Sequence, residues 1–314
     1  MTTLASRLVL ANLFLGCLSV SGGAQVPQGM RPVGGAGEVL YRLDLETTYS
    51  RGCYPPCDCL LVTTEDVYGT FTLRFEGSDV RGLRHYRVGA VNWIVTLEGE
   101  DHRVTGGGTY VVGGELALTQ RLELDLALDA DPAQHFDSGP IVGGSGFPGI
   151  DIAVSVNGMY CYDEVYEIVA SPVPAGEVRP YSVGGTSYEE GCFPPCRCMI
   201  RDWPVDGAYG LVPLSAFDPE WQHFGLVHVR WSTLPSNPSD PPDRRFRGFG
   251  IYSRSPALGL QRLAADLTDQ DEITRRFDSG VVTGGGGFPS IDADLSVGGF
   301  YCFDYAFLLR SRPR

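Results

Sequence analysis

Two carboxylates stand in identical four-residue motifs that lie far apart in the chain. The motif Phe-Asp-Ser-Gly begins at Phe136 and again at Phe277, so it supplies Asp137 and Asp278 in the same setting. Two aspartates that lie close together can share one proton and activate a water molecule for hydrolysis. An Asp-Ser-Gly sequence also forms a turn, in which the aspartate accepts hydrogen bonds from backbone N–H groups. The motif therefore has a catalytic and a structural interpretation.

The catalytic interpretation depends on a family resemblance. Phe-Asp-Ser-Gly resembles the Asp-Thr/Ser-Gly signature of pepsin-like aspartic proteases, which also have two β-rich lobes with one motif each. The resemblance implies an aspartic-type hydrolase in which Asp137 and Asp278 form the catalytic pair. In that family the motif lies early in each lobe and continues with Ser or Thr, whereas here it lies late and continues with Pro140 or Val281. We favour the turn, with the hydrolase as the alternative.

Eight cysteines form two groups of four, and the first three of each group have the same spacing. They are Cys53, Cys57, Cys59, Cys161, Cys192, Cys196, Cys198 and Cys302. An even number in each group is typical of two disulfides per group in an oxidising compartment. The Pro-Pro pair favours Cys53–Cys57 with Cys59–Cys161, and the other arrangement is Cys53–Cys59 with Cys57–Cys161. A four-thiolate zinc site is a further alternative, although the usual pair of Cys-x2-Cys hooks is absent.

Four further aspartates lie near glycine-rich loops, where their oxygens could bind calcium. They are Asp151, Asp163, Asp292 and Asp304. The spacing lacks the Asp-x-Asp-x-Asp-Gly pattern of a calcium loop, so we expect turn and hairpin-end roles and no cofactor, with calcium as the alternative. His85 and His223 occupy matching positions, eight residues before a tryptophan, and are expected to be hydrogen-bonded core groups.

The repeated motifs and cysteines lie in a tandem repeat, so the fold of each copy must position its own set of them. Tyr49–Cys59 matches Tyr188–Cys198 at an offset of 139 positions, and residues 143–163 match 284–304 at 141. Short segments of alternating branched and aromatic residues predict β-strands nearly throughout, and 41 glycines and 22 prolines suit the turns between them. We predict an all-β fold made of two tandem copies of a disulfide-stapled antiparallel β-sandwich or barrel-like domain, each with about eight strands.

Within each copy a hairpin is expected near the end, with Asn157-Gly158 as its two-residue turn in the first copy and Gly298-Gly299 in the second. The predicted organisation is a signal peptide over 1–24, a flexible tail over 25–38, the first repeat over 39–172, a linker over 173–178 and the second repeat over 179–314.

The first residues carry one positive charge, an apolar run and then small residues, which is the pattern of a secretory signal peptide. We therefore expect a periplasmic or secreted protein, and lipid attachment at Cys17 is the less favoured alternative. No later stretch is apolar for long enough to form a transmembrane helix.

Charge and composition exclude several kinds of chemistry. The formal net charge is −14, so the surface repels phosphate backbones and a nucleic-acid partner is not expected. The chain contains no lysine, which removes Schiff-base, P-loop and Ser-Lys chemistry. Gly-x-Ser-x-Gly and His-Glu-x-x-His motifs are absent as well. The sequence thus favours a non-enzymatic binding or structural module of the cell envelope or extracellular space, with a metal-dependent binding module as a further alternative.

Overall fold

A computed structural model describes most of the chain. The described residues are 37–57, 62–115, 117–143, 146–216, 218–235 and 244–314. The predicted signal peptide, nearly all of the predicted tail, Cys17 and Cys59 lie outside them. The described residues belong to one compact unit and form strands, with a single three-residue 3₁₀ turn, so the all-β prediction is confirmed. In this part of the chain no helix has the length and apolar character needed to cross a membrane.

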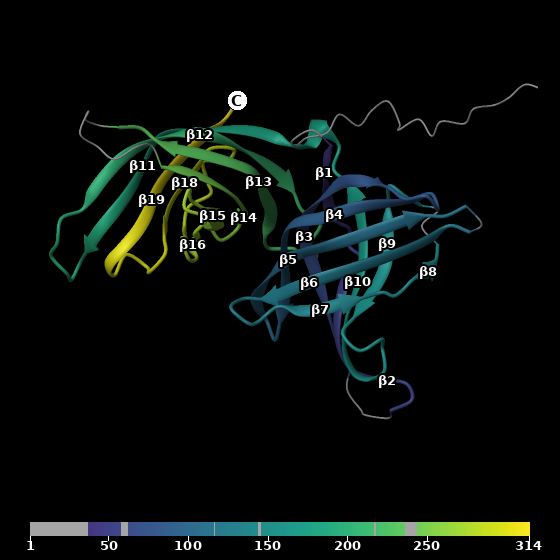
Figure 1. The fold of residues 1–314 in the computed structure, drawn as a ribbon. Helices are drawn as coiled ribbons and strands as arrows, with labels where there is room; N and C mark the ends of the chain where they lie inside the picture. The colour runs from purple at the N-terminus through teal and green to yellow at the C-terminus, as the bar shows by residue number, and fades with distance from the viewer. Residues whose placement is uncertain (1–36, 58–61, 116, 144–145, 217, 236–243) are drawn as a thin grey trace, which may run out of the picture. The chain divides into compact units, whose positions relative to one another are not determined.

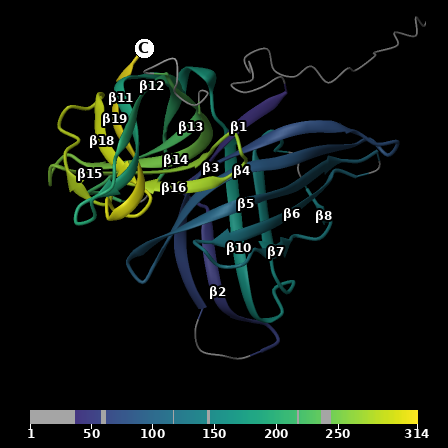
Figure 2. The same ribbon diagram turned by 60° about the vertical axis from the view of Figure 1, so that its left-hand side comes forward.

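The first sheet closes on itself. Its strands are β1 (Glu38–Leu43), β2 (Thr48–Tyr54), β3 (Val62–Ser78), β4 (Leu83–Leu97), β5 (Glu100–Gly113), β6 (Thr119–Leu128), β7 (Gln134–Asp137), β8 (Ile141–Val142), β9 (Ile150–Ser155) and β10 (Cys161–Pro172). Successive strands pair antiparallel, and β10 pairs with both β9 and β2 (Figures 1 and 2). The result is an eight-stranded up-and-down barrel, in which β1 extends the position of β2. The barrel form of the prediction is therefore the one observed.

The second sheet closes in the same order. Its strands are β11 (Arg179–Phe193), β12 (Arg201–Pro213), β13 (Gln222–Thr233), β14 (Arg245–Ser255), β15 (Leu260–Thr268), β16 (Thr274–Asp278), β17 (Val282–Thr283), β18 (Ile291–Ser296) and β19 (Cys302–Pro313). Here β11 pairs with β19, and β14 pairs with β15 to complete the ring. The single strand β11, which has an irregularity after Val183, occupies the position that β1 and β2 share in the first barrel.

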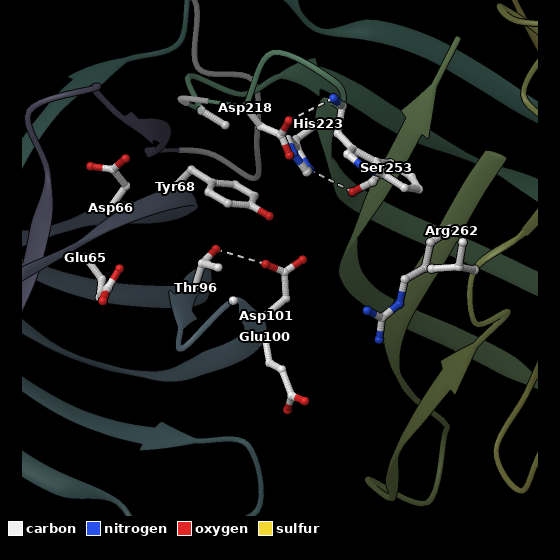
Figure 3. Close-up of a pocket in the computed structure, with 14 residues that line it drawn as sticks. Glu65, Asp66, Tyr68, Thr96, Glu100, Asp101, Asp218, His223, Ser253 and Arg262 are labelled. Carbon is white, nitrogen blue, oxygen red and sulfur yellow. Dashed lines mark hydrogen bonds and ion pairs between the residues drawn. The ribbon is translucent and has the colours of Figure 1, made fainter. Parts of the chain in front are cut away.

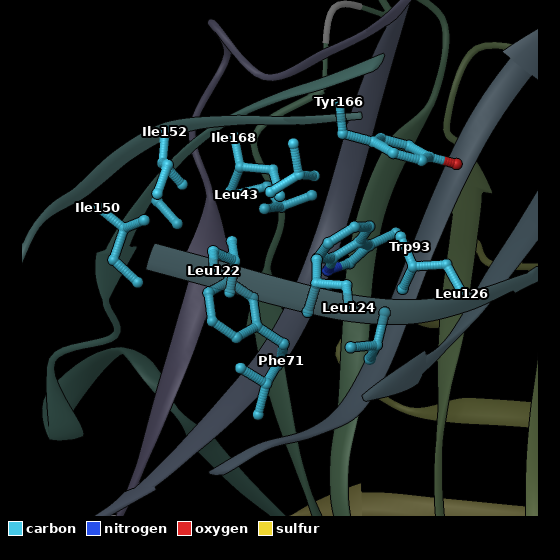
Figure 4. Close-up of a cluster of buried hydrophobic side chains, with 14 of the residues drawn as sticks. Leu43, Phe71, Trp93, Leu122, Leu124, Leu126, Ile150, Ile152, Tyr166 and Ile168 are labelled. Carbon is cyan, nitrogen blue, oxygen red and sulfur yellow. The ribbon is translucent and has the colours of Figure 1, made fainter. Parts of the chain in front are cut away.

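Side chains fill the interior of each barrel, as expected for eight strands. In the first barrel Trp93 lies among other apolar residues and packs with Phe71 and Tyr166, at ring-centroid distances of 6.1 and 5.8 Å (Figure 4). In the second, Trp231 occupies the matching position and lies 5.2 Å from Phe307. Each buried side chain of this size contributes roughly 1.5–3 kcal/mol relative to exposure, so each barrel has a core of its own.

The two barrels also contact each other through outward-facing side chains. Tyr68 and Ile94 of the first barrel form a small buried cluster with Ile251 of the second. The Asn92 side chain donates a buried hydrogen bond of 2.9 Å to the carbonyl oxygen of Gly250. A buried ion pair also joins Arg103 to Asp266. These contacts bury both faces of the central part of β3 and β4.

The segment between the barrels is packed. Strand β10 ends at Pro172, β11 begins at Arg179, and a 3₁₀ turn, η1 (Ala175–Glu177), lies between them. Val173 is buried in a cluster with residues of both barrels, and the Arg42 guanidinium lies 2.8 Å from the Glu177 carboxylate.

The favoured disulfide pairing is wrong: both bonds of the second barrel follow the other arrangement, and so does the Cys57–Cys161 bond of the first. In the second barrel Cys192 bonds to Cys198 and Cys196 to Cys302. In the first, Cys57 bonds to Cys161, and Cys53 is also disulfide-bonded. The reason is strand register: the first strand pairs with the last, and this places the Pro-Pro turn beside the start of the last strand.

The expected two-residue hairpin turn is also wrong. Strands β9 and β10 end their pairing at Ser155 and Val165, which leaves a longer loop between them. The buried Asp163 carboxylate closes this loop by accepting hydrogen bonds from the N–H groups of Asn157 and Met159, at 2.9 and 2.6 Å. Asp304 does the same for Gly298 and Phe300 in the second barrel. In both barrels a carboxylate therefore accepts hydrogen bonds from the N–H groups of the loop, in place of the backbone hydrogen bonds that a tight turn would make.

We predict that the long bridges stabilise more than the short ones. Replacing Cys196 and Cys302, 106 positions apart, with serine should lower the free energy of unfolding by about 4–5 kcal/mol in the loop-entropy model. Replacing Cys192 and Cys198, 6 positions apart, should cost about 2 kcal/mol in the same model. Urea denaturation of both double variants measures the difference. Equal losses would contradict the prediction.

Candidate functional site

The two Asp-Ser-Gly motifs form turns within their own barrels. Both oxygens of Asp137 accept hydrogen bonds from Arg121, at 3.0 and 2.7 Å, and the Gly139 N–H donates to Asp137 at 2.8 Å. Asp278 has the same partners at matching positions, with Arg262 at 3.2 and 2.7 Å and the Gly280 N–H at 2.8 Å. These contacts support the turn interpretation.

The charge state of the two aspartates supports the same interpretation. The hydrogen bonds from Arg121 are the main cause that lowers the pKa of Asp137. Burial acts to raise the pKa of Asp278, but Arg262 and the turn outweigh it and the pKa is lowered. A proton-sharing pair needs one carboxyl whose pKa is raised. Each of these carboxylates is instead paired with an arginine.

The four aspartates considered for calcium have other interactions. Asp163 and Asp304 hold the hairpin loops described above. The Asp292 carboxylate lies 2.8 Å from the Arg312 guanidinium, and Asp151 is exposed on β9. The structure therefore does not bring these four together around one point.

A different group of potential metal ligands comes together on the first barrel. Among the described residues Glu123, His135 and Asp137 have ligand atoms within 4.8 Å of one another. The Arg121 guanidinium lies 2.8 Å from Glu123 and 2.7 Å from Asp137, so a fixed cation already neutralises this group. We therefore do not assign a metal site there.

The two matching histidines differ. His223 is 7% exposed and its Nδ1 lies 2.8 Å from the Ser253 hydroxyl, so the prediction of a hydrogen-bonded core group is confirmed. The side chain of His85 is 43% exposed, and the prediction is wrong for it. The difference arises because His223 faces the other barrel, where the Tyr68 ring packs against it at a centroid distance of 4.6 Å.

A cavity lined by many ionisable side chains lies beside His223, between the two barrels. Its volume is about 720 Å³. Five carboxylates line it, and Figure 3 shows them on both sides of the space. They are Glu65, Asp66, Glu100, Asp101 and Asp218. We call this space the acidic cavity.

Several elements position the lining residues. Glu65 and Asp66 lie on β3, and Asp101 lies at the start of β5, where the Thr96 hydroxyl donates a 2.9 Å hydrogen bond to its carboxylate. Asp218 caps the turn before β13 by accepting hydrogen bonds from the N–H groups of residues 220 and 221, at 2.8 and 3.1 Å. A backbone turn thus holds Asp218, and a side-chain hydroxyl holds Asp101.

The cations of the acidic cavity do not neutralise it. Arg262 lines the cavity, but its guanidinium is bound to Asp278. Burial lowers the pKa of His223 despite the opposing effect of Asp101 and Asp218, so the imidazole is neutral at pH 7. Burial likewise raises the pKa of Tyr68, whose hydroxyl faces the space in Figure 3. The site therefore carries an excess of negative charge.

Ser253, His223 and Asp218 together include the residue types of a hydrolytic triad. The Ser253 hydroxyl is within hydrogen-bonding distance of His223, but His223 Nε2 lies 3.7 Å from Asp218, beyond a hydrogen bond. The first barrel has the same histidine–aspartate separation, 3.7 Å between His85 and Asp79, and Asp79 also caps its turn. The pair thus recurs at the same turn of both barrels.

Sequence reasoning missed the acidic cavity because its residues come from separate strands and turns of both repeats. The available signal was the concentration of acids in Glu-Gly-Glu-Asp, residues 98–101, on a chain of net charge −14. Comparisons with protein-family models, curated proteins and solved structures found no match to this chain.

We predict that Asp137 and Asp278 contribute to stability. Replacing either with alanine should cost about 1 kcal/mol, as for loss of a side-chain cap, and the two effects should add. Their pKa values are lowered in the folded state, so this contribution is present above the ordinary pKa and is lost as the pH falls through the folded value. Denaturation curves of the single and double variants measure it. Acid-range peptidase activity that either substitution abolishes, with stability unchanged, would support the hydrolase instead.

We also predict that buried histidine makes folding sensitive to pH. Because the pKa of His223 lies below its ordinary 6.5 when folded, the unfolded chain binds more protons, and stability falls as the pH drops below that value. His223→Gln should make the loss of stability between about pH 7 and pH 5 less steep. Burial also lowers the pKa of His228, so this histidine should account for part of the pH dependence that the variant keeps. Urea midpoints at several pH values test this. Ser253→Ala keeps the imidazole and should retain the slope, and an unchanged slope in His223→Gln would refute the prediction.

Proposed function

We propose that this chain is a non-enzymatic binding protein of the cell envelope or extracellular space, and that its acidic cavity binds an organic cation. The ligand class is a molecule carrying ammonium or guanidinium groups, such as a polyamine or a basic peptide segment. One observation carries the proposal: five carboxylates line a single cavity whose arginine is bound to Asp278 and whose histidine is uncharged.

Size favours an organic cation over a single metal ion. A volume of about 720 Å³ suits a small molecule, within the roughly 300–1,000 Å³ range of ligand pockets. Among the described residues, the group whose ligand atoms converge within 4.8 Å lies elsewhere, around Glu123. The acids of the cavity are therefore distributed around a space, as an extended ligand with more than one cationic group requires.

Aromatic groups in the cavity support the same class of ligand. Tyr68 and Trp221 line it beside the carboxylates. Aromatic faces attract ammonium and guanidinium groups and shield them from water. The proposal for location has separate support, since the disulfides are typical of an oxidising extracytoplasmic compartment.

We predict that the chain binds spermidine or a tetra-arginine peptide and that binding weakens with salt, because screening reduces attraction between charges. Glu100→Gln combined with Asp101→Asn should weaken binding about tenfold or more. A matched control, Asp151→Asn with Glu167→Gln, removes two exposed charges outside the cavity and should have little effect. Titration calorimetry at low and high salt measures both variants.

Because the chain has no lysine, chemical coupling of spermidine to carboxylates can identify the residues that bind it. A carbodiimide joins carboxylates to amines, and no lysine side chain of this chain competes with the amines of spermidine. Mass spectrometry should find the adducts on residues 65–66, 100–101 and 218. No binding of either probe, or equal losses in the two double variants, would refute the proposal.

A further inference from the structure

The first barrel has a second cavity, at one mouth of its interior. It has a volume of about 410 Å³, within the size range of small-molecule sites. Buried core side chains form its floor, among them Tyr49, Leu126, Phe136 and Tyr166. Leu97 and Leu128 add to the apolar wall. We call this space the barrel mouth, and it shares no lining residue with the acidic cavity.

A small polar group lies at the rim of the barrel mouth. The Tyr49 hydroxyl donates a 2.9 Å hydrogen bond to Glu164, and the Arg51 Nε lies 3.5 Å from the same carboxylate. Arg51 also donates to the Tyr162 hydroxyl at 2.7 Å. These residues face one another across β2 and β10, where Arg51 pairs with Glu164 and Tyr49 with Tyr166. One side of the otherwise apolar barrel mouth thus carries hydrogen-bond donors and acceptors that neighbouring side chains hold in place.

The second barrel shows the same mouth occupied by its own side chains. Arg275 corresponds to Gln134, since both precede the buried phenylalanine of the Phe-Asp-Ser-Gly motif by two residues. Its guanidinium lies 4.6 Å from the Tyr305 ring centroid and 2.7 Å from the Asp269 carboxylate. Asp269 corresponds in turn to Leu128, because the strand pairs Leu126–Gln134 and Leu267–Arg275 match.

A second arginine covers the rest of that mouth. Arg244 lies over the rings of Tyr188 and Trp203, at 5.5 and 5.3 Å, and 2.7 Å from Glu190. Tyr188 and Glu190 occupy the positions of Tyr49 and Arg51 in the first barrel. Two of the charged side chains at the second mouth, Arg275 and Asp269, are therefore replaced around the first by Gln134 and Leu128, and Arg51 lies at the rim in the position of Glu190.

From this contrast we infer that the barrel mouth of the first barrel is a binding site for a small, mostly apolar molecule with one hydrogen-bonding group. The apolar part packs on Phe136, Leu126 and Leu128, and the polar group reaches Glu164 or Arg51 at the rim. This inference goes beyond the proposed function, because it concerns a separate site with a different class of ligand.

The test uses N-phenyl-1-naphthylamine, an uncharged dye whose fluorescence rises in apolar sites and whose N–H can donate to Glu164. Titration of the folded chain should show one saturable site. Leu128→Asp combined with Gln134→Arg introduces the charged pair of the second barrel and should weaken dye binding about tenfold or more. Ala133→Trp, at the exposed rim, should block the same space without adding charge.

Controls separate this inference from the cation-binding proposal. Thermal unfolding of each variant confirms that it is folded. Glu100→Gln with Asp101→Asn should leave dye binding unchanged, and spermidine should not displace the dye. The inference is overturned if the dye does not bind the folded chain, or if the charged-pair variant and Ala133→Trp both bind it as tightly as the unaltered chain.

Discussion

Each barrel depends on the pairing of its first strand with its last. Strands β1 and β2 share one position and pair with β10, and β11 pairs with β19, so every strand edge in the ring has a partner. Within each barrel these contacts are the most distant in sequence and carry the largest loop-closure cost. Cys57–Cys161 and Cys196–Cys302 fix this seam covalently. The barrel mouth also lies on the seam, because β2 and β10 supply its polar rim.

The contact between the barrels explains why burial does not alternate along every strand. In an isolated barrel, inward residues are buried and outward residues meet water. Residues 67–73 of β3 and 91–95 of β4 are instead buried without interruption. Their outward side chains pack on the second barrel or lie against the acidic cavity. The same contact buries His223 and lowers the pKa of its imidazole, so that this side chain adds no positive charge to the cavity at neutral pH.

Much of the fold could be predicted from local sequence patterns. Alternating apolar residues, glycine-rich turns and the repeated motifs give the all-β class, because strand formation depends on spacing along the chain. The disulfide pairing could not be predicted in this way, since it depends on which strands meet when the barrel closes. The prediction of a two-residue hairpin turn is wrong for a related reason. Asn157-Gly158 suits a tight turn locally, but the buried Asp163 supplies a competing set of hydrogen bonds. The acidic cavity was beyond prediction because its acids converge only in three dimensions.

The matching positions of the two barrels divide into two kinds with different physical constraints. Trp93 and Trp231, or Phe136 and Phe277, lie in closely packed interiors where a change of volume is costly, and they are the same in both. Rim positions have one free face, so Leu128 can stand where the other barrel has Asp269 without disturbing the core. Chemistry can therefore differ between two barrels that share one architecture. A role assigned to a side chain in one barrel does not transfer to its counterpart unless the contacts of both are the same, as they are for Asp137 and Asp278 and are not for His85 and His223.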